Sequence, residues 1–204
     1  MFKGRVDAAQ KLLPKLKKFE NTNTCVVGLL RGGIITAKVL SEFLLLPLQP
    51  LIVKKIGAPT NPEFAIGAMV DEKNIYKNVD IYNLLNISKK TEQKLIKEKM
   101  QEINILKKQL KIKRFKTYQN IIIADDGVAT GATVIAAWKF LKRRKVKNIF
   151  LATPVISSDT LRNIKVYFDT VYFLKKPKDF YAVSEFYQNF QQVTNEEVSS
   201  ILHP

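Results

Sequence analysis

The chain has 204 residues, of which 46% are hydrophobic and 25% are charged, and it carries a formal net charge of +16. This composition is typical of a soluble globular protein with a sizeable core, and it excludes a disordered or fibrous chain. No apolar run approaches the roughly 20 residues that a membrane-spanning helix needs. The single cysteine, Cys25, allows no internal disulfide. We therefore expect a cytoplasmic protein with no membrane partner.

The excess of positive charge has two interpretations. Lys and Arg number 34 against 18 Asp and Glu, with denser patches at 107–116 and 139–147, and such patches can bind nucleic acid. The chain is also rich in Lys, Ile and Asn together, and its lysines are spread widely. We favour general basicity over nucleic acid as a partner. A basic protein also attracts small polyanionic substrates.

Short apolar runs alternate with segments of helical periodicity along the chain. This pattern predicts an α/β fold, in which a central and mainly parallel sheet of about five strands is flanked by helices. The predicted elements, in chain order, are a helix at 2–19 that Pro14 kinks or breaks, a strand at 24–29, a helix at 34–46, a strand at 50–53, a loop at 54–62, a hairpin of 64–70 and 74–79, a helix from Ser88 to about 110, a strand at 120–124, a helix at 132–144, strands at 148–155 and 170–174, and a short helix at 195–201.

The segment 121–133 combines an apolar strand, two acids, a turn of small residues and the start of a helix. Asp125 and Asp126 stand at the carboxyl end of the strand, where open α/β sheets bind ligands. The turn lets backbone N–H groups converge on an anion, and the helix adds the positive end of its dipole. A sugar with a phosphate at one end and a diol beside it satisfies all these groups. The alternative interpretation is a helix cap preceded by solvated acids.

This segment resembles the phosphate-binding loop of the type I phosphoribosyltransferases. The resemblance implies that Asp125 and Asp126 contact the ribose hydroxyls of 5-phosphoribosyl-1-pyrophosphate and, through ribose and water, a Mg²⁺ ion. It also implies that a turn wraps the 5′-phosphate. The candidate substrate-binding residues of this turn are Gly127, Val128, Ala129, Thr130, Gly131, Ala132 and Thr133. The resemblance covers nearly the whole chain and is closest to a group of bacterial and archaeal predicted phosphoribosyltransferases of about this length, whose acceptor is not settled. Phe2, Arg5 and Phe190 are among the positions that carry it.

A second segment looks like the pyrophosphate loop of the same family. It is a strand followed by Arg31, Gly32 and Gly33. Arg31 can pair with a phosphate in a fork geometry, and the two glycines permit close approach of the backbone. The family often holds a strained, sometimes cis, peptide at this point, and Leu30–Arg31 is the corresponding bond.

The segment after the second strand supplies further candidates. Lys54 and Lys55 fit the basic residues that meet the pyrophosphate in the family, although two solvated lysines at a strand end are an equally good interpretation. Glu63 is a candidate lid acid acting on the acceptor, and the alternative is an exposed loop glutamate. The aromatic stretch 179–187 forms either a hood that stacks on a nucleobase or the packing of a small subdomain. The candidate catalytic residues are Asp125, Asp126, Arg31 and Glu63.

The resemblance also implies the organisation of the chain. We expect a single phosphoribosyltransferase domain over residues 1–204. Its core comprises about 20–56 and 118–175, a lid or insertion spans about 56–118, and a small hood at about 175–204 joins the N-terminal segment. Homodimerisation is usual for the family and is expected here.

The expected function is Mg²⁺-dependent transfer of the phosphoribosyl group to a nucleobase or a related nitrogen acceptor, with release of pyrophosphate. In the family that this chain resembles, enzymes for 6-oxopurines usually place an Asp immediately before the Thr-Gly of the loop, and Ala129 at that position argues against such an acceptor. Two alternatives remain. One is a non-catalytic sensor of phosphoribosyl diphosphate that binds nucleic acid through its lysines, and the other is a hydrolase of phosphoribosyl compounds.

Overall fold

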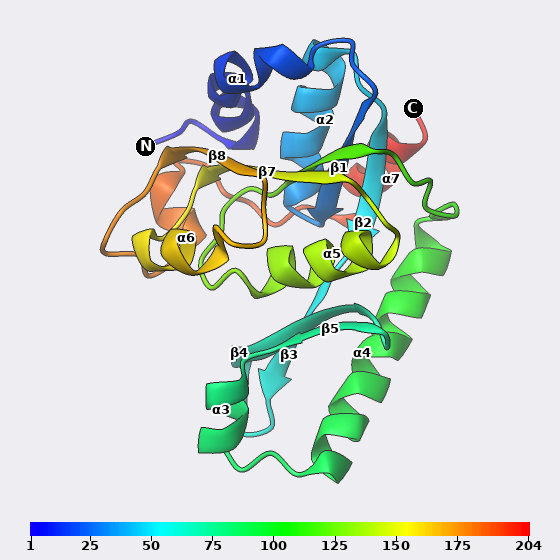
Figure 1. The fold of residues 1–204 in the computed structure, drawn as a ribbon, viewed down its shortest axis with the longest axis vertical. Helices are drawn as coiled ribbons and strands as arrows, with labels where there is room; N and C mark the ends of the chain where they lie inside the picture. The colour runs from blue at the N-terminus through cyan, green and yellow to red at the C-terminus, as the bar shows by residue number, and fades with distance from the viewer.

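In the computed structural model, which describes residues 1–204 apart from the side chain of Glu63, five parallel strands form a central sheet with helices on both faces (Figure 1). The strands, in order across the sheet, are β2 (Leu48–Ile52), β1 (Thr24–Leu30), β6 (Asn120–Ala124), β7 (Asn148–Val155) and β8 (Thr170–Lys175). The predicted α/β class and the predicted parallel sheet are confirmed.

The alternation of side chains along β6 explains why helices cover both faces of the sheet. Ile121 and Ile123 pack in one buried cluster with two helices, and Ile122 and Ala124 pack in another cluster on the opposite face. The first layer consists of α5 (Ala132–Arg143) and α6 (Ser158–Ile164), and the second consists of α1 (Arg5–Leu16) and α2 (Gly33–Leu44). A strand buried on both faces has no solvent side, which is why 120–124 is almost continuously apolar.

A second, smaller sheet lies on the far side of α5 (Figure 1). It is antiparallel, and its order is β3 (Lys54–Ala58), β4 (Asn61–Asp71) and β5 (Asn74–Lys77), followed in the chain by α3 (Val79–Leu84) and α4 (Lys89–Gln109). Helix α5 contacts β4 and β5 as well as the main sheet, and Lys139 donates to the carbonyl of Ile75 at 3.0 Å. The predicted hairpin after Phe64 is therefore confirmed as β4 and β5.

The two ends of the chain pair with each other beside the main sheet. The N–H of Phe2 donates to the carbonyl of Phe186 (2.7 Å), and the N–H of Gln188 donates back to Phe2 (2.8 Å). Phe2 and Tyr187 are both buried in a small aromatic cluster. The C-terminal segment also contains a short turn, η2 (Val183–Phe186), and α7 (Asn195–Leu202).

The predicted loop at 54–62 is wrong, because this segment contains β3 and the beginning of β4. Gly57, Pro59 and Pro62 are turn-type residues, and they hide the strands in the sequence. The structure requires a glycine at 57, because a Cβ there would lie 2.1 Å from the carbonyl oxygen of Pro62.

The helical predictions need smaller corrections. Helix α1 is not broken at Pro14: it continues to Leu16 and passes into a 3-10 turn, η1 (Lys17–Phe19). Helices α3 and α6 are not predicted from the sequence, since six and seven residues are too few to display a helical period clearly. Within the described part of the chain, no helix has both the length and the apolar character needed to cross a bilayer.

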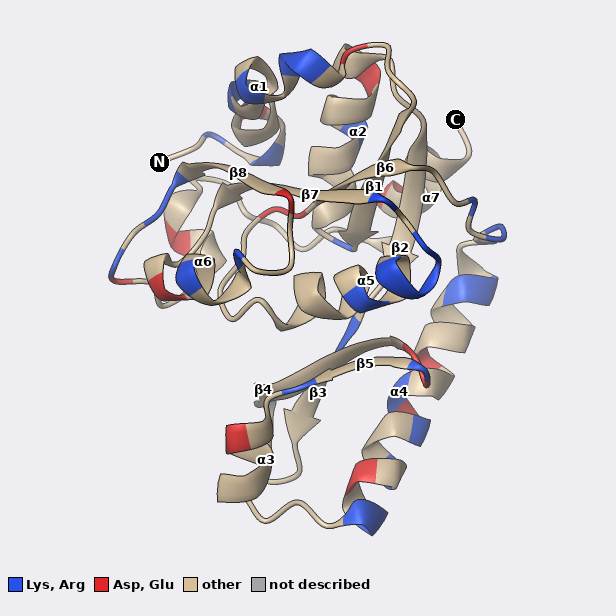
Figure 2. Ribbon diagram, in the orientation of Figure 1, with Lys and Arg blue, Asp and Glu red and all other residues tan. Residues whose placement is uncertain are grey.

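Lys and Arg residues occur over much of the structure, and they gather at two neighbouring segments (Figure 2). One is the end of α4 with the residues that follow it (107–116), and the other is the turn after α5 (142–147). Lys107, Lys113, Arg114 and Arg144 line one small cavity of about 150 Å³ between them. These two segments are called the basic face below.

Candidate functional site

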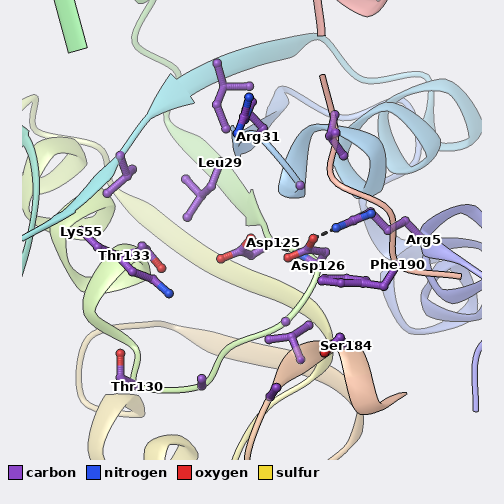
Figure 3. A pocket seen from close by; sticks show the side chains of 18 of the residues that line it. Arg5, Leu29, Arg31, Lys55, Asp125, Asp126, Thr130, Thr133, Ser184 and Phe190 are labelled. Carbon is purple, nitrogen blue, oxygen red and sulfur yellow. Dashed lines mark hydrogen bonds and ion pairs between the residues drawn. The ribbon is translucent and has the colours of Figure 1, made fainter. Parts of the chain in front are cut away.

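The site lies where β1 and β6 end next to each other. Gly28 of β1 is opposite Ala124 of β6 in the parallel register, so the loops that follow these strands leave the sheet at the same edge. A cavity of about 750 Å³ opens there (Figure 3). It is lined by the loop after β6 (125–131, the acidic loop), by the loop after β1, by the start of β3 and by the segment 181–193 (the C-terminal arm).

Asp125 and Asp126 stand at the centre of the cavity wall (Figure 3). The N–H of Asp125 donates to the carbonyl of Ala152 in β7 (3.2 Å), and the N–H of Asp126 donates to the Asp125 carboxylate (3.0 Å). Burial raises the pKa of the Asp125 carboxyl well above its ordinary value, and the charge of Asp126 raises it further. The Asp126 N–H and Lys55 oppose this rise in pKa. The structure therefore brings together two acids that differ in environment.

The acidic loop enters α5 at Gly131, where φ is 78°. This left-handed conformation favours glycine, and Gly131 has no side chain with which to cap the helix. Thr130 and Thr133, one before and one after Gly131 in the chain, also line the cavity. Thr160 of α6 donates to the carbonyl of Ala129 and holds the turn from behind. This end of the cavity can therefore offer an anion backbone donors, two hydroxyls and the positive end of a helix.

The loop after β1 closes another side of the cavity. Its Leu30–Arg31 peptide is cis, as the resemblance implied, and Arg31 lines the cavity. A Cβ on Gly32 would lie 2.0 Å from a carboxylate oxygen of Asp126, and a Cβ on Gly33 would lie 2.6 Å from the last carbonyl of β6. The two glycines thus allow this loop to lie directly against the acidic loop.

The structure separates the two lysines that the sequence places together. Lys55 lines the cavity, whereas Lys54 reaches α4, where its Nζ lies 3.2 Å from the carboxylate of Glu102. Successive side chains of a strand point to opposite faces, so only one of the two can face the cavity. The side chain of Glu63, the candidate lid acid, lies outside the described residues.

The other predicted residues divide into those that line the cavity and those that support it. Gly127, Ala129, Thr130, Gly131 and Thr133 line it. Gly33, Val128 and Ala132 are buried and are not among the lining residues. Val128 is 2% exposed, and its N–H donates to Val155 of β7 at 2.9 Å, so it anchors the acidic loop to the sheet.

Sequence reasoning missed Arg5 as part of the site, and it missed the part of the C-terminal arm that lies beyond the predicted hood at 179–187. Arg5 Nε lies 2.7 Å from a carboxylate oxygen of Asp126, 121 residues away in the sequence. The arm contributes Tyr181, Ala182, Val183, Ser184, Phe190, Gln192 and Val193. A weak signal existed, because Phe2, Arg5 and Phe190 are among the positions that match the family. Of the predicted aromatic hood, Tyr181 lines the cavity, but Phe180 and Phe186 pack on each other with centroids 5.2 Å apart.

The family model of the phosphoribosyl transferase domain matches residues 5–191. Two proteins of Mycobacterium tuberculosis, from the strains H37Rv and CDC 1551, are each 30% identical over 207 residues, and both carry the name "Putative phosphoribosyl transferase". The matches cover 99% of this chain and 46% of each relative. The chain thus spans about half the length of the curated relatives it matches.

Solved structures include one that is similar throughout. The protein TT1426 from Thermus thermophilus has a TM-score of 0.80 and 29% sequence identity, covering 98% of this chain and 97% of that chain. A hypoxanthine-guanine phosphoribosyltransferase from Bacillus anthracis has a TM-score of 0.51 at 14% identity, covering 91% and 89% of the two chains. At that identity the likeness concerns the fold alone.

Proposed function

Because the chain belongs to the phosphoribosyl transferase domain family, we propose that it transfers the phosphoribosyl group of 5-phosphoribosyl-1-pyrophosphate to a nucleobase or a related nitrogen acceptor, releasing pyrophosphate. One observation carries the proposal. The acidic pair Asp125 and Asp126, the N-terminus of α5, and the cations Arg31 and Lys55 converge on a single cavity. The donor has a diol, a phosphate and a pyrophosphate, and these three features of the cavity match them.

The donor would lie across the cavity in one orientation. The ribose hydroxyls donate to Asp125 and Asp126, which accept hydrogen bonds as carboxylates. The 5′-phosphate takes the end formed by Thr130, Gly131 and the first turn of α5. The pyrophosphate lies toward Arg31 and Lys55, where positive charges are available. In this orientation each phosphate meets donors or cations and the diol meets acceptors.

We propose Mg²⁺ as the cofactor, in line with the family. When bound, it neutralises charge on the pyrophosphate and makes it a better leaving group. Within the described residues there is no cluster of three or more His, Cys, Asp or Glu side chains that could hold a metal alone. The acidic pair nevertheless offers oxygen ligands, and Mg²⁺ commonly combines one or two carboxylates with phosphate oxygens and water. Asp125 and Asp126 fit such indirect binding.

The contribution of the chain to the reaction is positioning and charge. Departure of pyrophosphate leaves an oxocarbenium-like sugar, so the carboxylates that hold the ribose and the cations that hold the leaving group must be fixed relative to each other. We propose that part of the segment 56–118 acts as a lid and keeps water from the cation. It begins next to Lys55, on the strand that lines the cavity.

For the acceptor we propose the region between the acidic loop and the C-terminal arm. The side chains by which the arm lines the cavity are uncharged, which supports a neutral acceptor. The ring of Tyr181 is available for stacking, since the residue is 86% exposed, whereas Phe190 is covered by the guanidinium of Arg5 at 3.8 Å. Ala129 in place of an acid supports an acceptor other than a 6-oxopurine.

The remaining expectations rest on the resemblance. The homodimer, the cytoplasmic location and the boundaries of lid and hood stay predictions. Arg31 and Lys55 both line the cavity where the leaving group would lie, which favours an enzyme over the sensor. A sensor has no need to stabilise a leaving group. A hydrolase would release the same pyrophosphate, so it differs from the transferase only in needing no acceptor.

The proposal is tested by calorimetric titration of 5-phosphoribosyl-1-pyrophosphate with Mg²⁺ into the wild type and into the double variant Asp125→Asn/Asp126→Asn. Micromolar binding by the wild type, weakened roughly a hundredfold in the variant, is expected because two charge-assisted hydrogen bonds are lost. Asp159→Asn is the matched control, since Asp159 is an exposed carboxylate of α6 that pairs with Arg162.

If the folded wild type does not bind, the proposed function is wrong. If it binds, pyrophosphate release is measured with a panel of nucleobases. Release with one base, and none without an acceptor, supports the transferase. Release without any acceptor supports the hydrolase instead.

A further inference from the structure

Arg5 connects the N-terminal segment to the acidic pair. Its Nε donates to an Asp126 carboxylate oxygen at 2.7 Å, and the two side chains are only 12% and 13% exposed (Figure 3). Its Nη1 donates to the carbonyl of Gln191 at 2.8 Å, and its guanidinium lies 3.8 Å from the centre of the Phe190 ring. One arginine thus holds an acid of the acidic loop and two residues of the C-terminal arm.

Asp126 is held from other directions as well. Tyr187 of the C-terminal arm donates from its hydroxyl to the backbone carbonyl of Asp126. The carboxylate oxygen that accepts from Arg5 also lies against the backbone of Gly32, at a distance that leaves no room for a Cβ. Tyr187 itself pairs with Phe2 through a β-bridge and a ring contact at 5.3 Å. Asp126 is therefore the point at which four segments of the chain meet.

The carboxylates of Asp125 and Asp126 consequently differ in how far they are free to rotate. Asp126 has one carboxylate oxygen engaged by Arg5, which leaves the other oxygen and its lone pairs for a ligand. Arg5 makes a single directional bond to this carboxylate, from Nε, while its Nη1 bonds the carbonyl of Gln191. The guanidinium is thus itself held in place, and its bond restricts the rotation of the carboxylate. Asp125 has no arginine partner of this kind among the described residues, and its carboxylate accepts from the N–H of Asp126.

We propose that Arg5 is a positioning residue for substrate binding: it orients the Asp126 carboxylate toward the ribose and locks the C-terminal arm over the acidic loop. This inference rests on the proposed function, because the ribose is the ligand of Asp126 in it. Arg5 lines the cavity, but both of its hydrogen bonds go to protein groups, so in this proposal it acts through Asp126 and not by contact with the donor. Its removal should therefore lower donor affinity without removing a group that takes part in the chemistry.

The first arm of the test is a double-mutant cycle on donor affinity. Arg5→Gln, Asp126→Asn and the double variant are titrated with 5-phosphoribosyl-1-pyrophosphate and Mg²⁺. Arg5→Gln is expected to weaken binding roughly tenfold, since an ordered carboxylate becomes mobile. In the Asp126→Asn background the same change is expected to weaken binding less than about twofold. A tenfold loss that persists in that background would mean that Arg5 meets the substrate directly, and would overturn the proposal.

The second arm needs no ligand. Hydrogen exchange is measured at the N–H groups of Gln188 and Asn189, which donate to Phe2 and Lys3. Arg5→Gln is expected to speed their exchange by roughly tenfold or more, because the arm loses one of its two side-chain attachments to the acidic loop and keeps only the bond from Tyr187. Arg162→Gln is the matched control: it breaks an exposed Arg–Asp pair in α6 and should change neither exchange nor affinity.

The two arms separate failure of this inference from failure of the proposed function. If the wild type binds donor and Arg5→Gln binds it equally well, the inference is wrong and the function stands. If the wild type does not bind donor, the function is wrong, and the substrate-positioning role of Arg5 is wrong with it. Unchanged exchange in Arg5→Gln would refute the locking of the arm in either case.

Discussion

Asp125 is a carboxyl group whose pKa is raised by burial and by the neighbouring charge of Asp126. An acid with a raised pKa in the folded state binds its proton more tightly there than in the unfolded state. Its contribution to stability is therefore complete below the ordinary pKa of an aspartate, and is lost as the pH rises through the raised value. The ionised form of Asp125, which costs this stability, is also the form that would accept hydrogen bonds from a ribose in the proposed function.

At the residue scale we therefore predict a pH-dependent gain of stability in Asp125→Asn. At acidic pH the variant and the wild type should have similar melting temperatures. As the pH rises toward neutral, the variant should become more stable than the wild type, because only the wild type must ionise a buried carboxyl. Each tenfold difference in proton affinity corresponds to about 1.4 kcal/mol. Thermal melts across this pH range test the prediction, with Asp159→Asn as control. A difference that does not change with pH would contradict it.

At the scale of elements, strand β3 assigns different tasks to two adjacent lysines. Lys55→Ala should weaken the binding of pyrophosphate with Mg²⁺ roughly tenfold or more, because a charged donor to a phosphate is lost. Lys54→Ala should change binding less than about twofold and should cost at most about 1 kcal/mol of stability, since its pair with Glu102 is partly exposed. Calorimetry on the two variants measures both effects. Equal losses of affinity would show that the alternation of β3 does not determine which lysine binds.

The same strand shows where prediction from the sequence stops. The apolar runs of β1, β6 and β7 are recognisable because buried parallel strands are nearly continuous in hydrophobicity. The sequence of β3 predicts a loop instead, because Gly57 and Pro59 dominate its appearance. If the segment is read as a loop, no alternation of side chains between two faces can be predicted, so the sequence does not show which of Lys54 and Lys55 faces the cavity. The acidic loop is predictable, since its strand, turn and helix are contiguous in the sequence.

At the scale of the whole molecule, some of the positively charged side chains are paired with acidic side chains and others are not. None of the ion pairs among the described residues involves a cation of the basic face, whereas lysines elsewhere pair with Asp7, Glu92 and Glu102. Arg144 of this face lies over the ring of Phe140, with 4.3 Å to the ring centre. An unneutralised patch of this kind attracts polyanions without reading their sequence.

We predict that any binding of single-stranded RNA to this patch is non-specific. Affinity should fall roughly a thousandfold between low and physiological salt, and it should be equal for unrelated sequences. Lys113→Gln/Arg114→Gln should weaken it, while Lys94→Gln, an exposed lysine of α4 outside the patch, should not. Filter binding at several salt concentrations measures these effects. Tight, sequence-dependent binding at physiological salt would instead favour the sensor that binds nucleic acid.

The contacts between the chain ends could not be predicted at any scale. Hydrophobic period and turn chemistry are local signals, and neither relates residue 5 to residues 126 and 190. The Arg5–Asp126 pair depends on the path of the whole chain, and the family resemblance alone indicated that Phe2, Arg5 and Phe190 matter. Residues that complete a site from a distance are therefore the part of this molecule that its sequence conceals.

The contacts that Arg5 makes to Asp126 and Gln191 also have a consequence for folding kinetics. The two hydrogen bonds that Arg5 makes to side chain and backbone join positions 121 and 186 residues apart. Contacts across such separations require long loops to close, so they form late relative to helices and neighbouring strands. A refolding chain would thus regain its sheet before the proposed ribose site is complete, and molecules arrested on the way would be compact but unable to bind the donor.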